Sequence, residues 1–442
     1  MSEPRPPSPD PAGAGNNALT RRGLLYSGAA GVAAVYGLKS TSGSAAVRRL
    51  TRSAAGTVTV GSNYSDAIPK KAFAATLKKF TQTSGVSVKL NSVDHNTFQE
   101  QINSYLQGQP QDVFTWFAGY RMQFFAQRNL LTPIDDVWEK LKPQFSPALQ
   151  AASKGLDGKY YFVPLYNYPW AVFYRPSLFK EKGYTVPKTW DQFIALAKKM
   201  KADGNPMVFT DKDGWPAMGT FDYINMRTNG YDFHVRLMAG KEAWDGAKVK
   251  AVFDHWRELL PHYNDGILGK TWQEGGTDLQ NKKGGMYVLG SFVGIQFTDK
   301  AAHDELTFFA FPQINPKWGQ DSVEAPIDGF LMSKKAKNVD EAKKLMGFLG
   351  TATAAETYLA TDPNDVATNK RASTKKYNAL QKKAQKLIGG AKHISQFMDR
   401  DTRPDFASTV MIPALQQFIN KPDDVASLVK NIEKQKKAIF GQ

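Results

Sequence analysis

A short segment of the chain is unusually rich in aromatic side chains. Residues 160–174, YYFVPLYNYPWAVFY, hold eight aromatic residues in fifteen positions. Flat rings bind the C–H faces of a sugar, and Asp, Asn, Glu or Arg side chains bind its hydroxyl groups. The segment therefore indicates a surface that binds a hydroxylated ligand, although some of its rings belong to a core. The candidates for ligand contact here are Tyr166, Asn167, Tyr168 and Trp170.

The residue patterns of common enzymes and metal sites do not occur in this sequence. Residues 269–271 end like a phosphate-binding loop, but Asn264 stands where that loop needs its first glycine. Residues 211–214 hold only part of a calcium loop. His255 and His262 are seven positions apart beside a proline and make no chelating pair. We therefore expect no catalytic residue, no metal and no cofactor.

The composition limits the class of protein. The 442 residues are 42% hydrophobic and 22% charged, which excludes a wholly disordered chain and a multi-span membrane protein. The lack of cysteine excludes a disulfide scaffold, a thiol nucleophile and a lipidated lipoprotein. Most of the net charge of +16 belongs to residues 1–55 and 370–442. Lysines such as Lys375 and Lys382 fit a solvated helical face, and without a nucleic-acid-binding motif we expect no nucleic-acid partner.

The first 55 residues have the pattern of an export signal. Residues 1–18 are rich in Pro, Ser, Gly and Ala and are expected to be disordered. Arg21 and Arg22 precede a mildly apolar run that ends at Leu38, and small residues follow it. The paired arginines resemble a twin-arginine signal, which predicts an exported protein in the periplasm or at the cell surface. An uncleaved leader that contacts the membrane is the alternative.

The candidate residues need a scaffold, and the first part of the folded region alternates strand and helix patterns. Apolar residues alternate at 58–60 and 86–90, and residues 112–116 form a continuous apolar strand pattern. Between these strands, residues 72–80 and 98–106 are apolar at helical spacing. This order predicts a parallel sheet with right-handed crossovers.

The rest of the chain is mostly helical with a few short strands. Helices are expected at 190–200 and 244–260, and apolar strands at 285–289 and 306–311. Further helices are expected at 340–349, 353–360, 375–388 and 424–440. No repeat divides the chain, so we expect two lobes rather than a string of modules.

Several short motifs occur in an order that resembles a known family. They are DVF at 112–114, RNLLTPIDD at 128–136, LDGKYYFVP at 156–164, VFYR at 172–175, PKTWD at 187–191, KKGGMYVLGSF at 282–292 and IDGF at 327–330. Together they resemble the extracellular solute-binding proteins of bacterial ABC importers, in the carbohydrate-binding branch that includes maltose-binding protein. The resemblance covers about residues 56–440.

The resemblance implies an α/β, two-lobed periplasmic-binding-protein-like fold with a hinge and an interlobe ligand cleft. Lobe one would comprise residues 56–166 plus 312–364. Lobe two would comprise residues 167–311 plus 365–442, with the C-terminal helices packing across both lobes. Such proteins close on a ligand by hinge motion, which excludes water and strengthens the hydrogen bonds to the ligand.

The resemblance also points to ligand-binding positions outside the aromatic segment. Phe292 stands near a position where the family often has Trp, and the Asp328 carboxylate could accept hydrogen bonds from two hydroxyl groups. Asp222 could instead cap a helix. The full set of these further candidates is Asn63, Tyr64, Trp116, Trp215, Asp222, Asn225, Ser291, Phe292, Asp328 and Gly329.

These observations predict a monomeric carrier without catalytic activity that captures a sugar or oligosaccharide outside the cytoplasmic membrane and delivers it to a membrane permease. Two alternatives stay open. One is the same fold for a non-sugar solute, such as a polyamine, an anion or a metal complex, and a cleft with many acids and no aromatic rings would favour the polyamine. The other is a secreted glycoside hydrolase, which would need a carboxylate pair.

Overall fold

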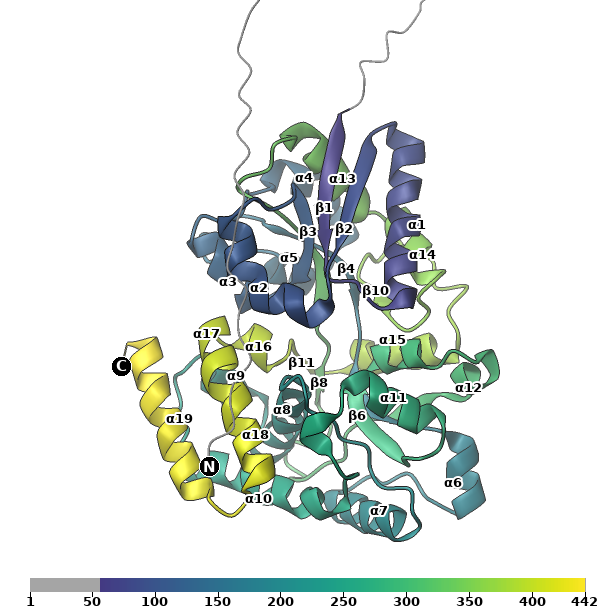
Figure 1. The fold of residues 1–442 in the computed structure, drawn as a ribbon, viewed down its shortest axis with the longest axis vertical. Helices are drawn as coiled ribbons and strands as arrows, with labels where there is room; N and C mark the ends of the chain where they lie inside the picture. The colour runs from purple at the N-terminus through teal and green to yellow at the C-terminus, as the bar shows by residue number, and fades with distance from the viewer. Residues whose placement is uncertain (1–55, 442) are drawn as a thin grey trace, which may run out of the picture. The chain divides into compact units, whose positions relative to one another are not determined.

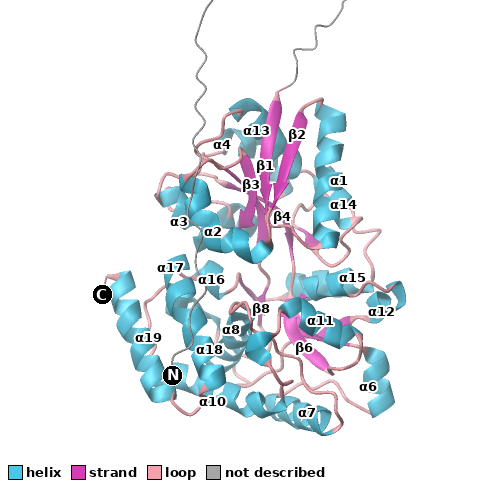
Figure 2. Cartoon of the chain, in the orientation of Figure 1, coloured by secondary structure: helices cyan, strands magenta, loops and turns pink. Residues whose placement is uncertain are grey.

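The computed structural model describes residues 56–441, which form a mixed α/β structure (Figures 1 and 2). One sheet has the strand order β10-β4-β9-β3-β1-β2, a second has the order β6-β5-β7, and a third pairs β11 with β8. The predicted export signal at 1–55 lies outside the described residues. Among the residues that are described, no helix combines the length and the apolarity that a membrane crossing requires.

The six-stranded sheet and the helices around it form the first lobe, in the upper part of Figure 1. Its strands are β1 (Thr57–Ser62), β2 (Ser87–Ser92), β3 (Val113–Phe117), β4 (Phe162–Asn167), β9 (Ile327–Met332) and β10 (Val366–Ala367). Its helices are α1 (Ala67–Ser84), α2 (His95–Gln107), α3 (Tyr120–Gln127), α4 (Asp135–Leu141), α5 (Pro147–Ala152), α13 (Val339–Leu349) and α14 (Ala352–Leu359).

The start of this lobe confirms the predicted strand–helix units. β1 runs parallel to both β2 and β3, and the side chains of Val58 and Val60 are buried. α1 buries Phe73, Leu77 and Phe80 on one face, as the helical spacing indicates. Gly85 caps the C-terminal end of α1, and its φ of 75° is a left-handed conformation that glycine adopts without steric cost.

The other two sheets belong to the second lobe. Its strands are β5 (Trp170–Tyr174), β6 (Met286–Gly290), β7 (Thr307–Phe309), β8 (Ser322–Glu324) and β11 (His393–Ser395). Its helices are α6 (Pro176–Lys182), α7 (Trp190–Ala202), α8 (Pro216–Asn229), α9 (Tyr231–Met238), α10 (Ala247–Leu259), α11 (Trp272–Gln280), α12 (Lys300–Glu305), α15 (Ala379–Gly390), α16 (Met398–Asp401), α17 (Pro404–Phe406), α18 (Ile412–Asn420) and α19 (Val425–Phe440). A π-helical turn at Ala407–Met411 joins α17 to α18.

The chain passes between the two lobes at short extended segments. Tyr168 and Pro169 separate β4 from β5, and the chain pairs again with the six-stranded sheet at β9, which begins at Ile327. Strand β10 also belongs to that sheet, just beyond the expected end of the first lobe at 364. The exact lobe boundaries stay a prediction, and the strand pairings favour a later return and a slightly later last crossing.

Candidate functional site

The carboxyl ends of the parallel strands β1, β2 and β3 open onto a cavity between the two lobes. Asn63 and Tyr64 follow β1, His95 follows β2 and Phe117 ends β3, and all four residues line the cavity. Its volume is about 100 Å³. Ligands of open α/β sheets bind at this edge of the sheet, so the topology alone brings these side chains to a ligand-binding position.

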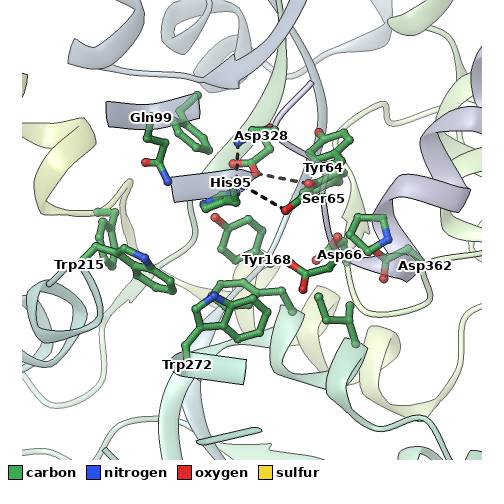
Figure 3. A pocket seen from close by; sticks show the side chains of 18 of the residues that line it. Tyr64, Ser65, Asp66, His95, Gln99, Tyr168, Trp215, Trp272, Asp328 and Asp362 are labelled. Carbon is green, nitrogen blue, oxygen red and sulfur yellow. Dashed lines mark hydrogen bonds between the residues drawn. The ribbon is translucent and has the colours of Figure 1, made fainter. Parts of the chain in front are cut away.

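The second lobe contributes a wall of aromatic rings to the cavity. Trp215 precedes α8 and Trp272 begins α11, and their ring centroids are 6.4 Å apart. Phe292 lies 6.0 Å from Trp215, and Phe397 lies 4.9 Å from Trp170 of β5. Figure 3 shows Trp215 at the left and Trp272 at the bottom of the view, with Tyr168 between Trp272 and His95. Flat rings in this arrangement present the surface that the C–H face of a sugar binds.

A buried arginine lines the cavity. Arg400 of α16 is 6% exposed, and its Nη1 donates a 2.8 Å hydrogen bond to Asp328 Oδ1 in β9. Its Nη2 donates to the hydroxyl of Tyr168 at 2.9 Å, and its Cζ lies 4.0 Å from the ring centroid of Phe117. Burial opposes the charge of the guanidinium, but Tyr168, Asp328 and Asp399 outweigh it and raise the pKa of Arg400. The side chain is therefore a fixed cationic donor.

Three of the tyrosines that line the cavity lie close together, and Figure 3 shows one of them, Tyr64, on the side away from Trp215. The rings of Tyr64, Tyr166 and Tyr358 lie 5.1 to 6.3 Å apart. Tyr166 donates a 3.3 Å hydrogen bond to Asp328, whereas the buried hydroxyl of Tyr64 has no partner among the described residues. This hydroxyl is therefore available to a ligand.

Acidic side chains accompany these tyrosines. Burial raises the pKa of Asp362 to about 6, although Asn364 and Tyr358 donate hydrogen bonds to its carboxylate. Burial, followed by the charge of Asp362, also raises the pKa of Asp365, whose Oδ1 receives no hydrogen bond within the described part of the chain. Figure 3 shows Asp362 and Asp66 together on this side of the cavity.

The arrangement suits binding of a polar guest with apolar faces. Five aspartates offer hydrogen-bond acceptors, Arg400 offers donors, and aromatic rings form much of the rest of the wall. Within residues 56–441, no three His, Asp or Glu side chains are placed to hold a metal ion. The aspartates that line the cavity are Asp66, Asp328, Asp362, Asp365 and Asp399.

Eight of the fourteen residues that the sequence analysis names as ligand candidates line this cavity, and their contact with a ligand stays a prediction. They come from the loop after β1, from β4, β5 and β9, from the segment that crosses between the lobes, and from the starts of α8 and of the 3₁₀ turn after β6. These residues are Asn63, Tyr64, Tyr166, Tyr168, Trp170, Trp215, Phe292 and Asp328.

Four of the other six candidates lie beside lining residues but do not themselves line the cavity. Side chains of a strand alternate between its two faces, so Trp116 lies on the face opposite Phe117 and packs against Phe98 and Phe125. Asn167 lies between the two lining tyrosines of its segment. Gly329 is enclosed between β3 and β4, and Ser291 is buried beside Phe292.

Asp222 and Asn225 lie inside α8, which is buried on all sides. Asp222 Oδ2 accepts a 2.7 Å hydrogen bond from the backbone N–H of Met398, and Asn225 lies 3.2 Å from His234 Nδ1. Neither residue lines the cavity, and Asp222 does not cap its own helix, because α8 begins at Pro216. Their contacts indicate a structural role.

Sequence reasoning missed most of the charged residues of the site. Asp399 and Arg400 lie in the basic C-terminal region that was interpreted as a solvated face, and Asp362 and Asp365 lie in a loop before β10. The sequence offered one signal for them, because residues 396–401 combine aromatic, acidic and basic side chains in a single short segment. Trp272 could have been found as an aromatic residue directly after the helix cap Thr271.

The sequence profile of the bacterial extracellular solute-binding protein family matches residues 61–356. The chain belongs to that family. Among individual relatives, this solute-binding protein is 28% identical to an uncharacterized ABC transporter extracellular-binding protein of Pyrococcus horikoshii, over 65% of this chain and 66% of that protein. It is 27% identical to the multiple sugar-binding protein of Streptococcus mutans, over 48% of this chain and 52% of that protein. The chain thus spans between half and two thirds of these curated relatives.

A solved structure gives a closer comparison. This solute-binding protein is 50% identical to the bacterial solute receptor AcbH, and the match covers 87% of this chain and 99% of AcbH with a TM-score of 0.85. AcbH has an exclusive substrate preference for β-D-galactopyranose. The two-lobed α/β fold predicted from the sequence is therefore confirmed.

Proposed function

We propose that this protein is the substrate-binding component of an ABC importer and captures a single pyranose sugar outside the cytoplasmic membrane. The observation that carries the proposal is the interlobe cavity, in which aromatic rings surround the ion pair of Arg400 and Asp328. Aromatic faces and fixed carboxylates are the groups that bind sugar rings and hydroxyls. The protein then hands the sugar unaltered to a membrane permease.

Two observations favour one sugar ring over an oligosaccharide. The cavity volume of about 100 Å³ corresponds to a handful of waters, which a single ring would replace. The receptor AcbH, half identical in sequence, prefers β-D-galactopyranose. Galactose is therefore the first sugar to test.

Calorimetry with the purified chain tests the proposal against a panel of galactose, glucose, xylose, maltose, putrescine and phosphate. We expect micromolar binding of a monosaccharide, which corresponds to about −8 kcal/mol. Saturating sugar should also raise the melting temperature, because a ligand that binds only the folded state stabilises it. Tighter binding of putrescine or phosphate, or recovery of a cleaved oligosaccharide, would reject the proposal.

We also propose that the protein is exported as a monomer by the pathway that recognises its paired arginines. The support is Arg21 and Arg22 before a short apolar run, together with membership of an extracellular family. Replacing both arginines by lysine should retain the protein in the cytoplasm, while a replacement of Arg48 and Arg49 should not. The molar mass of the exported protein, measured by light scattering, should be that of one chain if the protein is a monomer.

A further inference from the structure

The segment that carries Phe397 and Arg400 into the cavity has an unusual backbone. Phe397 has φ 137° and ψ 145°, a region that residues other than glycine rarely adopt. This turn follows β11 and begins α16, so its conformation determines where the Phe397 ring and the Arg400 guanidinium lie. Such a turn persists only when surrounding groups hold it.

Two carboxylates that do not line the cavity hold this turn: Asp222, which is buried, and Asp401, which is half-buried. Asp401 Oδ2 accepts hydrogen bonds from the backbone N–H of Gln396 at 2.8 Å and of Phe397 at 3.4 Å. Asp222 Oδ2 accepts from the next N–H, that of Met398, at 2.7 Å. The two carboxylates thus bind consecutive N–H groups of the strained turn, while Phe397 and Arg400 face the cavity.

The second oxygen of Asp222 faces another buried acid. Glu324 of β8 is fully buried, α8 packs against β8, and the two carboxyl groups are close enough that each changes the pKa of the other. Three carboxyl oxygens of this pair, Oε1 and Oε2 of Glu324 and Oδ1 of Asp222, lack a hydrogen-bond donor among the described residues. Two facing carboxylates cannot satisfy one another unless one of them carries a proton.

Burial raises the pKa of both acids, but the backbone N–H of Met398 lowers that of Asp222, which favours Glu324 as the acid that keeps the proton. Burial, and then the charge of Asp222, raises the pKa of Glu324 well above its usual range, and Asp401 adds to this repulsion while Arg400 opposes it. His234 of α9 lies 3.9 Å from Asp222 and is neutral, because burial lowers its pKa to about 3. The hydroxyl of Tyr223 in α8 accepts a 3.3 Å hydrogen bond from the backbone N–H of Glu324. Asp399 is the remaining charged neighbour of the pair.

We propose that Glu324 is a positioning residue for ligand binding: in its protonated form it donates a hydrogen bond to Asp222, which holds the 396–398 turn and so keeps Phe397 and Arg400 in the cavity. Glu324 does not line the cavity and acts only through Asp222 and the turn. The inference rests on the proposed function, because it concerns the same site. Deprotonation at alkaline pH places two buried charges face to face, so the turn loses its support and sugar affinity falls.

The test compares full-chain variants by calorimetry with galactose from pH 5 to pH 9. Glu324→Ala removes the donor and should weaken binding about tenfold, whereas Glu324→Gln keeps a donor that cannot ionise. We expect Glu324→Gln to restore the affinity that Glu324→Ala loses and to abolish the alkaline loss seen in the wild type. If Glu324→Gln follows the wild-type pH profile, the proposal is wrong.

Hydrogen exchange measured by mass spectrometry tests the turn itself without any ligand. Asp222→Ala should speed exchange in the peptide that contains residues 396–398. Asp112→Ala is the matched control, because Asp112 is also a buried aspartate that accepts backbone N–H groups, those of Thr59, Lys337 and Asn338, but lies at the far end of β3. Equal exchange of this peptide in the two variants would overturn the proposal.

The two arms separate this inference from the proposed function. If the wild type binds none of the sugars, the proposed function fails, and the exchange of residues 396–398 still decides whether the buried pair holds the turn. If Asp222→Ala does not fold, exchange in Glu324→Ala and Glu324→Gln is compared instead. Faster exchange in the alanine variant alone supports the proposal, and equal exchange contradicts it.

Discussion

The guanidinium of Arg400 and the carboxylate of Asp328 meet at 2.8 Å in the cavity, and the two residues come from different lobes. Asp328 belongs to β9 of the six-stranded sheet, whereas Arg400 belongs to α16, which packs against α8 and α9 of the second lobe and against α3 of the first. A second ion pair runs in the opposite direction, from Arg121 of α3 to Asp399 of α16 at 3.1 Å. These reciprocal pairs hold the donors and acceptors of the cavity in place before a ligand arrives, which reduces the ordering cost of binding.

Replacing Arg400 by methionine should impair both stability and binding. Asp328 would remain buried without its partner, and the loss of one member of a buried ion pair costs about 3–5 kcal/mol. We expect urea unfolding to show this loss and calorimetry to show at least about tenfold weaker sugar binding.

The double variant Arg400→Met with Asp328→Asn separates the two effects. It removes the unpaired charge, so the free energy of unfolding should recover, while the affinity should stay low because the cationic donor is missing. Wild-type affinity in the double variant would show that the ion pair takes no part in binding.

The aromatic wall predicts a difference between two tryptophans. Trp215 is half-buried and lines the cavity, so Trp215→Ala should weaken sugar binding by about 1–3 kcal/mol with a modest effect on stability. Trp116 is 1% exposed and packs in the core, so Trp116→Ala should cost about 3–5 kcal/mol of unfolding free energy. Affinity per folded molecule should be unchanged in Trp116→Ala, and equal affinity losses in both variants would contradict this placement.

The contrast between Trp116 and Phe117 shows what the sequence could predict about the site. The order of motifs was sufficient to predict the two-lobed fold and to indicate several segments that approach the cavity. Within a strand, however, only alternate side chains share a face, and the aromatic strand β3 is buried on both faces. Its composition therefore gives no sign of which ring faces the cavity.

Helix α8 and Arg400 show two other limits. Residues 216–227 are buried on every side, so α8 has no polar face and no amphipathic period to indicate a helix. Arg400 is buried only because Asp328, distant in sequence, pairs with it in the folded state. The tertiary contacts that compensate a buried charge cannot be predicted from composition or local residue spacing.

Acidification should destabilise the protein through His234. Burial lowers the pKa of this histidine to about 3, so its contribution to stability is complete above the unfolded pKa of about 6.5 and is lost as the pH falls toward 3. At 1.36 kcal/mol per pKa unit, the full loss is about 5 kcal/mol. Urea unfolding from pH 7 to pH 4 should therefore show a shallower decline in His234→Gln than in the wild type.

His262→Gln is the control for that measurement. This histidine is half-buried, and burial together with Lys198 and Lys201 lowers its pKa. Because the ring of His262 is still partly hydrated, His262→Gln should reduce the decline of the unfolding free energy at low pH less than His234→Gln does. Equal slopes in His234→Gln and the wild type would show that another group governs acid unfolding.

Gly329 should tolerate no side chain, because the backbones around β9 approach it closely. A Cβ at this position would collide with the carbonyl oxygen of Val163 and lie 2.9 Å from Cα of Pro164, and neither atom can move without breaking the sheet. Gly329→Ala should therefore reduce the free energy of unfolding by several kcal/mol and displace the adjacent Asp328. Gly347→Ala is the matched control, since its Cβ would meet only Val137 at 3.9 Å and alanine is favoured by about 0.5–1 kcal/mol within α13. Thermal unfolding of both variants should show opposite shifts, and a stable Gly329→Ala protein would contradict the close packing of β4 and β9.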